Sequence, residues 1–338
     1  MTASVTQAAV LGAGSWGTAL AIHLGSVGHE VTLWGRDQDL LQEMLRRRAN
    51  PTYLPDFTFP RPVRPTPDLA DALAGARHVI VAVPSHGLRS VVRAAAPHIP
   101  SDAVLVSATK GIETDSLQRM SEVLTEETGG RNPVVALSGP SFAAEVASHL
   151  PTALVAASGD ERAVRAVQEE FRGPSFRLYA SDDVAGVEIG AALKNIIAIA
   201  AGVVESLNLG HNAMSALITR GLAEISRLAC AMGGRRETLA GLSGLGDLVL
   251  TCTGSLSRNR HVGLELGRGR SIHDILAGMR MVAEGVRTTT AALALGARHQ
   301  VELPIAAQMG DVLAGRKTPK AAVGDLMLRP QRGEFDRE

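Results

Sequence analysis

The stretch Gly12-Ala13-Gly14-Ser15-Trp16-Gly17 decides the fold of this chain. It follows an apolar run at residues 8–11 that predicts a β-strand, and it opens a helical pattern at residues 18–26. The first glycine permits a tight turn, the second lets the backbone approach a pyrophosphate, and the third lets the helix pack on the strand. The helix N-terminus adds free N–H groups. The stretch therefore predicts a dinucleotide site rather than a plain glycine turn, with Trp16 against the cofactor.

Strand and helix patterns alternate from residue 8 to about residue 181, which is typical of βαβ units in a parallel sheet. A proline-rich segment at residues 51–67 is expected to be irregular, because each proline removes a hydrogen-bond donor. Helices are expected at residues 18–26 and 117–125. The expected strands are residues 8–11, 30–34, 78–83, 103–107, 134–137 and 152–156.

Strand patterns stop after about residue 183, and helical patterns with glycine or proline at the joints follow. We therefore predict an α/β protein with two domains. Residues 1–183 form a Rossmann-type parallel-sheet domain that binds NAD(P), and residues 184–338 form an all-α domain that binds the substrate. The expected helices of the second domain are residues 184–206, 213–232, 258–266, 284–298, 304–313 and 319–327.

Charge and composition exclude several classes of protein. Lysine and arginine number 34 and aspartate and glutamate number 34, so the net charge of zero argues against a nucleic-acid partner or a polybasic membrane surface. With 45% hydrophobic and 20% charged residues, the chain is an ordinary globular one. The apolar run at residues 189–204 is shorter than a membrane span and is expected to be a buried helix, not a membrane insertion.

Cysteine and histidine usage favours the cytoplasm and gives no metal site. The two cysteines, Cys230 and Cys252, form no Cys-x-x-Cys pair, and the ten histidines show no ligand spacing. Cys252 is expected to be a packed small residue. The N-terminus lacks the basic and apolar segments of a signal peptide, so a cytoplasmic location is expected.

The second predicted strand ends where the cofactor ribose is recognised in Rossmann folds. Arg36 at this point can pair with the 2′-phosphate of NADP(H), while the adjacent Asp37 leaves NAD(H) possible. A solvated surface arginine is the alternative interpretation of Arg36.

Two later strand ends deliver further polar residues to the same edge of the sheet. Lys110 follows the strand at residues 103–107 and would place a positive charge over the nicotinamide end. Gly139, Ser141 and Ala143 follow the strand at residues 134–137 and can offer backbone and hydroxyl groups to the cofactor at a helix start; we also count Ser141 as substrate-binding.

Lys194 is the only ionisable side chain between Glu188 and Glu205. A buried ammonium is costly and normally has a partner or a function. Burial and a nearby cation such as Lys110 would both lower the pKa of Lys194, which suits a general acid–base group. The alternative is a lysine that reaches to water from an apolar helix.

A glycine- and hydroxyl-rich segment at residues 241–260 ends in Ser257-Arg258-Asn259-Arg260. A helix start with guanidinium groups can hold a phosphate, although a capped surface helix is the plainer interpretation. Asp247 would be the lone carboxylate among these cations, and Arg258 and Arg260 are expected to converge with the lysines on one crevice.

With these residues assembled, the chain resembles the bacterial NAD(P)-dependent glycerol-3-phosphate dehydrogenases over nearly its whole length. The resemblance implies that Lys194 is the proton donor or acceptor. The motifs that carry it are Gly-Ala-Gly-Ser-Trp-Gly-Thr-Ala at 12–19, Ala-Thr-Lys-Gly at 108–111, Ser-Gly-Pro-Ser-Phe-Ala at 138–143, Lys194-Asn195, Gly-Leu-Gly-Asp-Leu at 244–248, Ser-Arg-Asn-Arg at 257–260 and Val-Ala-Glu-Gly at 282–285. The implied substrate contacts are Lys110, Gly139, Asp247, Ser257, Arg258 and Asn259. The implied cofactor contacts are Ser15, Trp16, Arg36, Lys110, Ala143, Arg258, Val282 and Glu284.

The expected reaction is the reversible reduction of dihydroxyacetone phosphate to sn-glycerol 3-phosphate, with hydride transfer from NAD(P)H to the C2 carbonyl; the resemblance implies a role in glycerophospholipid synthesis. Two alternatives remain open. One is a dehydrogenase of the β-hydroxyacid or ketopantoate type, which acts on carboxylates, and the other is a non-catalytic NADP(H) sensor. The alanine- and glycine-rich helical domain also suggests a homodimer.

Overall fold

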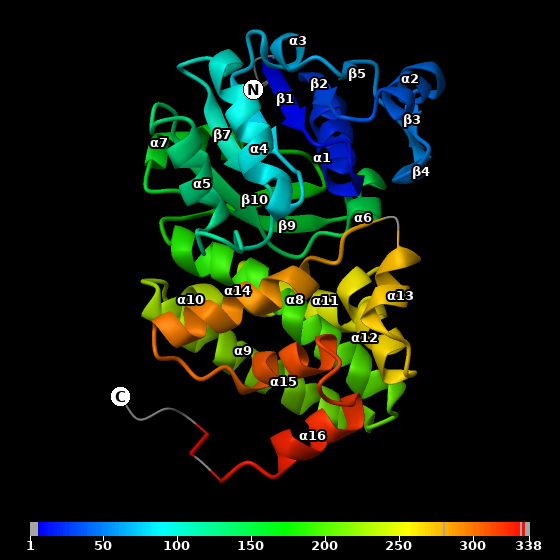
Figure 1. The fold of residues 1–338 in the computed structure, drawn as a ribbon. Helices are drawn as coiled ribbons and strands as arrows, with labels where there is room; N and C mark the ends of the chain where they lie inside the picture. The colour runs from blue at the N-terminus through cyan, green and yellow to red at the C-terminus, as the bar shows by residue number, and fades with distance from the viewer. Residues whose placement is uncertain (1–5, 280, 332, 335–338) are drawn as a thin grey trace.

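The computed structural model describes residues 6–279, 281–331 and 333–334. A sheet with its covering helices (the sheet part) forms the upper half of the molecule in Figure 1, and helices α8 to α16 (the helical part) form the lower half. The sheet has eight strands in the order β10-β9-β8-β7-β6-β1-β2-β5. Its strands are β1 (Gln7–Leu11), β2 (Glu30–Trp34), β5 (Val63–Thr66), β6 (His78–Val81), β7 (Val104–Ser107), β8 (Val134–Ser138), β9 (Thr152–Ala157) and β10 (Phe176–Ser181).

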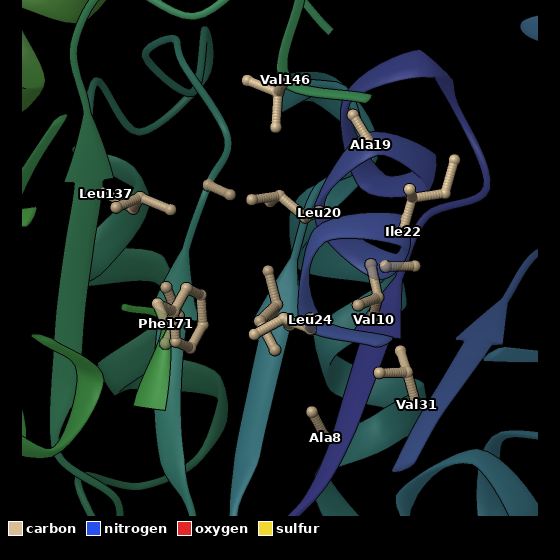
Figure 2. Packing of buried hydrophobic residues seen from close by; sticks show 14 of the residues in the cluster. Ala8, Val10, Ala19, Leu20, Ile22, Leu24, Val31, Leu137, Val146 and Phe171 are labelled. Atoms are coloured by element: carbon tan, nitrogen blue, oxygen red, sulfur yellow. The ribbon is translucent and has the colours of Figure 1, made fainter. Parts of the chain in front are cut away.

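Helices cover both faces of this sheet. One face packs against α1, α2, α6 and α7 through an aliphatic core, and Figure 2 shows Leu20 and Leu24 of α1 in it, among Val10, Leu137 and Phe171. The other face packs against α3, α4 and α5. The helices of the sheet part are α1 (Ser15–Ser26), α2 (Gln38–Arg47), α3 (Leu69–Leu73), α4 (Ser85–Ala95), α5 (Met120–Glu127), α6 (Ala143–Ala147) and α7 (Glu161–Glu170).

The long helix α8 (Val184–Ser206) organises the helical part. It is buried from Gly186 to Val204 and packs against α9, α11, α12 and α14. The contact with α12 is close because Gly202 and Gly263 face each other's backbone, and a Cβ at Gly263 would lie 1.9 Å from the Ile199 carbonyl oxygen. The remaining helices are α9 (Gly210–Ala231), α10 (Arg236–Leu239), α11 (Asp247–Thr253), α12 (Arg258–Gly267), α13 (Ile272–Ala277), α14 (Glu284–Arg298), α15 (Pro304–Leu313) and α16 (Pro319–Met327).

This architecture confirms the predicted fold class, a Rossmann-type sheet followed by an all-α region. Among the residues that the structure describes, α8 is the single unbroken helix long and apolar enough to cross a membrane, and the bent pair α10–α11 plus α12 passes the same test only if it is counted as one span. The apolar window of α8 is fully buried, as expected for a core helix. Cys230 and Cys252 are both free thiols.

The sheet is parallel except at one edge. Strand β9 pairs antiparallel with β8, and β10 then pairs parallel with β9. Strand β10 was not predicted from the sequence, because at the sheet edge only Phe176 and Leu178 are buried and it lacks a continuous apolar run.

The proline-rich segment also contains more regular structure than expected. Strands β3 (Ala49–Asn50) and β4 (Leu54–Thr58) form a small antiparallel hairpin, and β5 adds to the other edge of the main sheet. Pro65 is tolerated in β5 because an edge strand has one unpaired side. The helix expected at residues 117–125 is α5, which begins at Met120.

Candidate functional site

The glycine-rich turn has the shape that a pyrophosphate requires. Gly12 has a positive φ of 124°, and a Cβ there would lie 2.5 Å from the Ala82 carbonyl oxygen. A Cβ at Gly17 would lie 1.9 Å from the Gly12 carbonyl oxygen, so α1 can pack this closely only on glycine. Gly14 has open space on its Cβ side and caps α1 without a side-chain hydrogen bond. The N–H groups of the first turn are therefore open to an anion, and the turn fits a dinucleotide.

A cavity of about 690 Å³ extends from this turn along the carboxyl edge of the sheet to the helical part. It collects most of the residues predicted from the sequence: Gly12, Gly14, Ser15, Trp16, Arg36, Lys110, Ser141, Ala143, Lys194, Asp247, Ser257, Arg258, Asn259, Val282 and Glu284. Gly17 and Gly139 do not line the cavity. Gly17 instead packs on the turn, and the Gly139 carbonyl accepts a hydrogen bond from Lys110 Nζ at 2.9 Å.

Arg36 and Asp37 have different surroundings at the end of β2. The Asp37 carboxylate accepts a hydrogen bond from Leu40 N at 3.0 Å and thereby caps α2. Arg36 is exposed and lines the cavity. One oxygen of the carboxylate is thus used by the helix, whereas the guanidinium is available to a ligand.

Two lysines converge on one buried carboxylate. Asp247, at the start of α11, has no exposed surface. Its Oδ1 accepts from Lys194 Nζ at 2.5 Å and its Oδ2 accepts from Lys110 Nζ at 2.7 Å. Lys194 Nζ also donates to Thr251 Oγ1 at 2.7 Å, and this hydroxyl donates to the Asp247 carbonyl at 2.6 Å. Helix α8, the loop after β7 and helix α11 thus bring together one group of coupled charges, the lysine–aspartate triad of Lys110, Lys194 and Asp247.

Burial and neighbouring charges shift the pKa values of Lys194 and Asp247. Burial lowers the pKa of Lys194 to about 8; the positive charge of Lys110 adds to this effect, while Asp247 opposes it. Burial acts to raise the pKa of Asp247, but Lys110 and Lys194 outweigh it and hold that pKa below its ordinary value. Lys194 can therefore exchange a proton near neutral pH while Asp247 stays ionised.

Arg258 is a further cation that lines the cavity. It follows Ser257, whose hydroxyl accepts from Arg260 N at 3.2 Å and caps α12. Desolvation lowers the pKa of Arg258, and Glu284 opposes this effect. The Arg258 guanidinium makes no hydrogen bond or ion pair with any residue that the structure describes. It therefore offers its donors to an anion in the cavity.

Asn259 and Arg260 have structural partners. Asn259 Nδ2 donates to Asn195 Oδ1 at 2.9 Å, and its Oδ1 accepts from Gly285 N at 2.9 Å, so one amide joins α12, α8 and α14. Arg260 does not join the other cations as expected. It pairs with Glu205 at 2.5 Å and does not line the cavity.

Glu284 bridges the two parts of the molecule. Its Oε1 accepts from Ser85 N at 3.0 Å and its Oε2 accepts from Ser85 Oγ at 2.6 Å, so a carboxylate of α14 caps helix α4. On the same side, Ser15 Oγ lies 3.2 Å from Met281 Sδ and 3.0 Å from the Tyr53 carbonyl. The helical part therefore reaches across the glycine-rich turn.

Comparison with known proteins places this chain in a family. The model described as NAD-dependent glycerol-3-phosphate dehydrogenase N-terminus matches residues 7–164, and the model for the C-terminus matches residues 183–324. The glycerol-3-phosphate dehydrogenase [NAD(P)+] of Syntrophotalea carbinolica is 54% identical over 97% of this chain and 99% of its own length. The protein belongs to the NAD-dependent glycerol-3-phosphate dehydrogenase family. It is therefore an NAD(P)-dependent oxidoreductase.

Further relatives agree with this assignment. The Koribacter versatilis glycerol-3-phosphate dehydrogenase [NAD(P)+] is 54% identical over 98% of this chain and 99% of its own length. The crystal structure of glycerol-3-phosphate dehydrogenase from Coxiella burnetii superposes with a TM-score of 0.93 at 41% identity, covering 96% of this chain and 99% of that one. A ketopantoate reductase from Ralstonia eutropha shares only the fold, with a TM-score of 0.61 at 17% identity and coverage of 94% and 100%.

For this dehydrogenase family member, the sequence analysis missed several residues around the site. Thr251 and Asn195 line the cavity and contact Lys194 and Asn259 respectively, although no role was predicted for either. The position of Asn195 directly after Lys194 was a usable signal. Ser85 gave none, because its partner Glu284 lies 199 residues away in the sequence.

Within the described residues, no group of three or more histidine, cysteine, aspartate or glutamate side chains is placed to hold a metal ion.

Proposed function

We propose that the protein catalyses the reversible reduction of dihydroxyacetone phosphate to sn-glycerol 3-phosphate with NADPH or NADH and so supplies glycerophospholipid synthesis. In this proposal residues 1–183 bind the cofactor and residues 184–338 bind the substrate. The observation that carries it is the lysine–aspartate triad in the same cavity as the open glycine-rich turn and the unpaired guanidinium of Arg258. These are the groups that a phosphorylated ketone and a dinucleotide need.

The cofactor residues support NADP(H) as the preferred form. The glycine-rich turn would hold the pyrophosphate, with Ser15, Trp16, Ala143, Val282 and Glu284 along the cavity wall. Arg36 would pair with a 2′-phosphate, whereas Asp37, which caps α2 through Oδ1, would still have Oδ2 for the ribose hydroxyl of NAD(H). When bound, the cofactor supplies or accepts the hydride.

The substrate residues divide into a phosphate end and a carbonyl end. Arg258 and the start of α12, which Ser257 caps, hold the phosphate dianion, and Asn259 fixes this helix start. Gly139 and Ser141 belong to the carbonyl end, because the Gly139 carbonyl accepts from both Ser141 Oγ and Lys110 Nζ. The C2 carbonyl oxygen then lies at the triad. Negative charge grows on this oxygen as the hydride arrives, and the Lys194 ammonium stabilises it and donates a proton. Lys110 adds positive charge, and Asp247 keeps the two ammonium groups together.

The reaction is tested by following NADPH oxidation with dihydroxyacetone phosphate and repeating the assay with NADH. We expect turnover with both and a lower KM for NADPH. Lys194→Ala should retain cofactor binding and lose turnover by about 10³-fold, because it removes the proton donor. Wild-type turnover by this variant would refute the assignment of Lys194.

A substrate panel separates the two rival functions. Activity on 2-keto or 3-keto carboxylates but none on the phosphate ester would favour a β-hydroxyacid or ketopantoate-type dehydrogenase. Cofactor binding without turnover across the whole panel would favour a sensor. The distant fold-level likeness to ketopantoate reductase gives that alternative little support.

For the assembly we propose a cytoplasmic homodimer. The support is a pair of exposed apolar side chains at the end of α16, Met327 at 79% and Leu328 at 85% exposure. Sedimentation equilibrium should give twice the mass of the chain, and Met327→Glu should shift the equilibrium toward the monomer. A concentration-independent monomer would contradict the proposal.

A further inference from the structure

A second buried carboxylate connects the lysine-bearing helix to the sheet part. Glu188 lies on α8, the residue is 5% exposed, and it does not line the cavity. Its Oε1 accepts from Ser121 N at 2.8 Å, and its Oε2 accepts from Ser121 Oγ at 2.6 Å and from Arg119 Nη1 at 2.9 Å. The carboxylate of α8 thus caps the first turn of α5 and pairs with the arginine that precedes it.

The segment that receives Glu188 is the one that carries Lys110. Residues 108–119 connect β7 to α5, with Lys110 near one end and Arg119 at the other. Between them, Ile112 is buried in the same apolar core as α8, and Leu117 packs against that core. This segment is therefore attached to the helical part by charge at both ends and by apolar contact in the middle.

The two residues of α8 that link it to this segment, Glu188 directly and Lys194 through Asp247, lie at different heights along the helix. Glu188 and Lys194 are six residues apart, or about 9 Å along a helix axis. Val187 of α8 also packs against β8 and β9, but this apolar contact has no directional hydrogen bonds. A second polar contact about 9 Å from Lys194 fixes the direction and the axial position of α8 against the segment that holds Lys110.

The chemistry of Glu188 also fits a positioning role. Burying a carboxylate with a cationic partner adds little to folding stability, because desolvation offsets much of the attraction, but it fixes geometry through directional hydrogen bonds. Arg119 and Glu122 are the charged groups that face it from α5 and its start, and Glu122 is held by Arg119. Both carboxylate oxygens of Glu188 are thus hydrogen-bonded, to Ser121 and Arg119.

We propose that Glu188 is a positioning residue for the reaction: by holding α8 on the start of α5, it keeps the Lys194 ammonium at the distance from Lys110 and Asp247 that catalysis needs. The inference rests on the proposed role of Lys194. Glu188 itself touches neither substrate nor cofactor in this proposal.

The test compares two isosteric variants of the full-length enzyme. Glu188→Gln keeps the side-chain size but removes the charge and turns an N–H₂ toward donors. The matched control is Glu224→Gln, because Glu224 is also buried and caps a helix, α15, through Ile305 N and Ala306 N at 2.9 Å each. Both partners of Glu224 lie within the helical part, so this control alters a buried cap without touching the link to the sheet part.

We expect Glu188→Gln to lower kcat for dihydroxyacetone phosphate reduction by about tenfold, since small displacements of a reacting group have effects of this order. The KM for NADPH should change by less than about twofold. Ser121→Ala, which removes one of the three hydrogen bonds and is the milder change, should lower kcat by about threefold. Glu224→Gln should leave kcat unchanged, whatever its effect on the melting temperature.

The pH at which reduction declines would not change through a general loss of stability, so the pH profile tests positioning separately. The charged and titratable groups around Lys194 are Asp247 and Cys252 of α11 and Lys110 of the β7–α5 segment. Because α11 packs against α8, Asp247 moves with Lys194 and keeps its attraction, whereas movement of α8 away from Lys110 weakens the repulsion that lowers the Lys194 pKa. The alkaline limb of the reduction profile should therefore shift to higher pH in Glu188→Gln and stay in place in Glu224→Gln.

Two results would overturn the inference. One is a wild-type kcat and pH profile in both Glu188→Gln and Ser121→Ala, and the other is an equal loss of kcat in Glu224→Gln. Lys194→Ala, measured in parallel, separates this inference from the proposed function. Wild-type turnover by Lys194→Ala refutes the role of Lys194 itself, whereas an inactive Lys194→Ala beside a fully active Glu188→Gln refutes only the positioning role.

Discussion

Replacing Asp247 by asparagine should convert the triad into two ammonium groups without a counter-charge. Asp247 is fully buried and accepts from Lys194 at 2.5 Å and from Lys110 at 2.7 Å. The amide retains one acceptor oxygen, but its N–H₂ faces the second lysine. Because Asp247 is the group that raises the Lys194 pKa against burial and Lys110, its loss lowers that pKa below the present value of about 8.

The size of the effect on reduction follows from the fraction of Lys194 that carries a proton. With a pKa of about 8, about 90% of the wild-type lysine is protonated at pH 7. Each unit by which the pKa falls below the assay pH lowers this fraction about tenfold, which equals about 1.4 kcal/mol. We therefore expect kcat for dihydroxyacetone phosphate reduction near neutral pH to fall by about 10- to 100-fold in Asp247→Asn.

The assay follows NADPH absorbance from about pH 6 to about pH 9 in both directions. Wild-type reduction needs protonated Lys194 and should decline as the pH rises through about 8, while glycerol 3-phosphate oxidation needs the neutral amine and should rise over the same range. In Asp247→Asn both limbs should move to lower pH. NADPH binding, followed by fluorescence, controls for folding, because removing one partner of a buried ion pair can cost about 3–5 kcal/mol of stability. A folded variant whose alkaline limb stays at the wild-type position would refute this account of the triad.

Three further predictions concern other residues. Burial raises the pKa of Glu224 to about 7, so the stability that its protonated form contributes is present below about pH 4.5 and lost as the pH rises through about 7. The difference in unfolding free energy between wild type and Glu224→Gln should therefore shrink by roughly 3 kcal/mol over this pH range. A difference that stays constant with pH would contradict this prediction. Gly17→Ala should lose about 2–4 kcal/mol of stability, because its Cβ would lie 1.9 Å from the Gly12 carbonyl oxygen. Gly14→Ala has open space for its Cβ and should fold normally but lose cofactor affinity. Equal melting temperatures for the two variants would be the opposite of this expectation. Cys252, whose pKa burial raises to about 12, should resist thiol reagents near pH 8 in the folded enzyme while the half-buried Cys230 reacts, as mass spectrometry can show.

The features that the sequence predicted are those fixed by local spacing. The glycine-rich turn requires three glycines within six residues, and Lys194 stands out because its neighbours in the chain are apolar. Strand β10 and the hairpin of β3 and β4 were missed, because edge strands depend on pairing partners more than on a continuous apolar run.

Contacts between distant segments account for what the sequence analysis missed in the site. Glu284 was expected at the cofactor through family resemblance, but its bonds to Ser85 join positions 199 residues apart, and no periodicity encodes such a contact. Arg260, in contrast, was predicted at the site but lies outside it. Its sequence neighbours suggested a phosphate ligand, but position 260 falls on the side of α12 toward Glu205, where the two residues pair. Spacing can identify a helix start that suits an anion, but it cannot say which of its cations already has a partner.

The charges in the cavity explain how a chain of zero net charge can hold a small dianion. Lys110 and Lys194 carry two positive charges against the single negative charge of Asp247, which leaves one positive charge at the triad. Arg258 provides a second positive charge at the phosphate end. The positive charge at the triad matches the single negative charge that grows on the carbonyl oxygen during reduction. The positive charge of Arg258 matches the phosphate, whose negative charge is present throughout the reaction. Because Lys194 and Asp247 are buried, the attraction at the triad is stronger than it would be at an exposed surface. The separation also assigns different kinetic effects: loss of Arg258 should raise the KM for the phosphorylated substrate, whereas loss of charge at the triad should lower kcat.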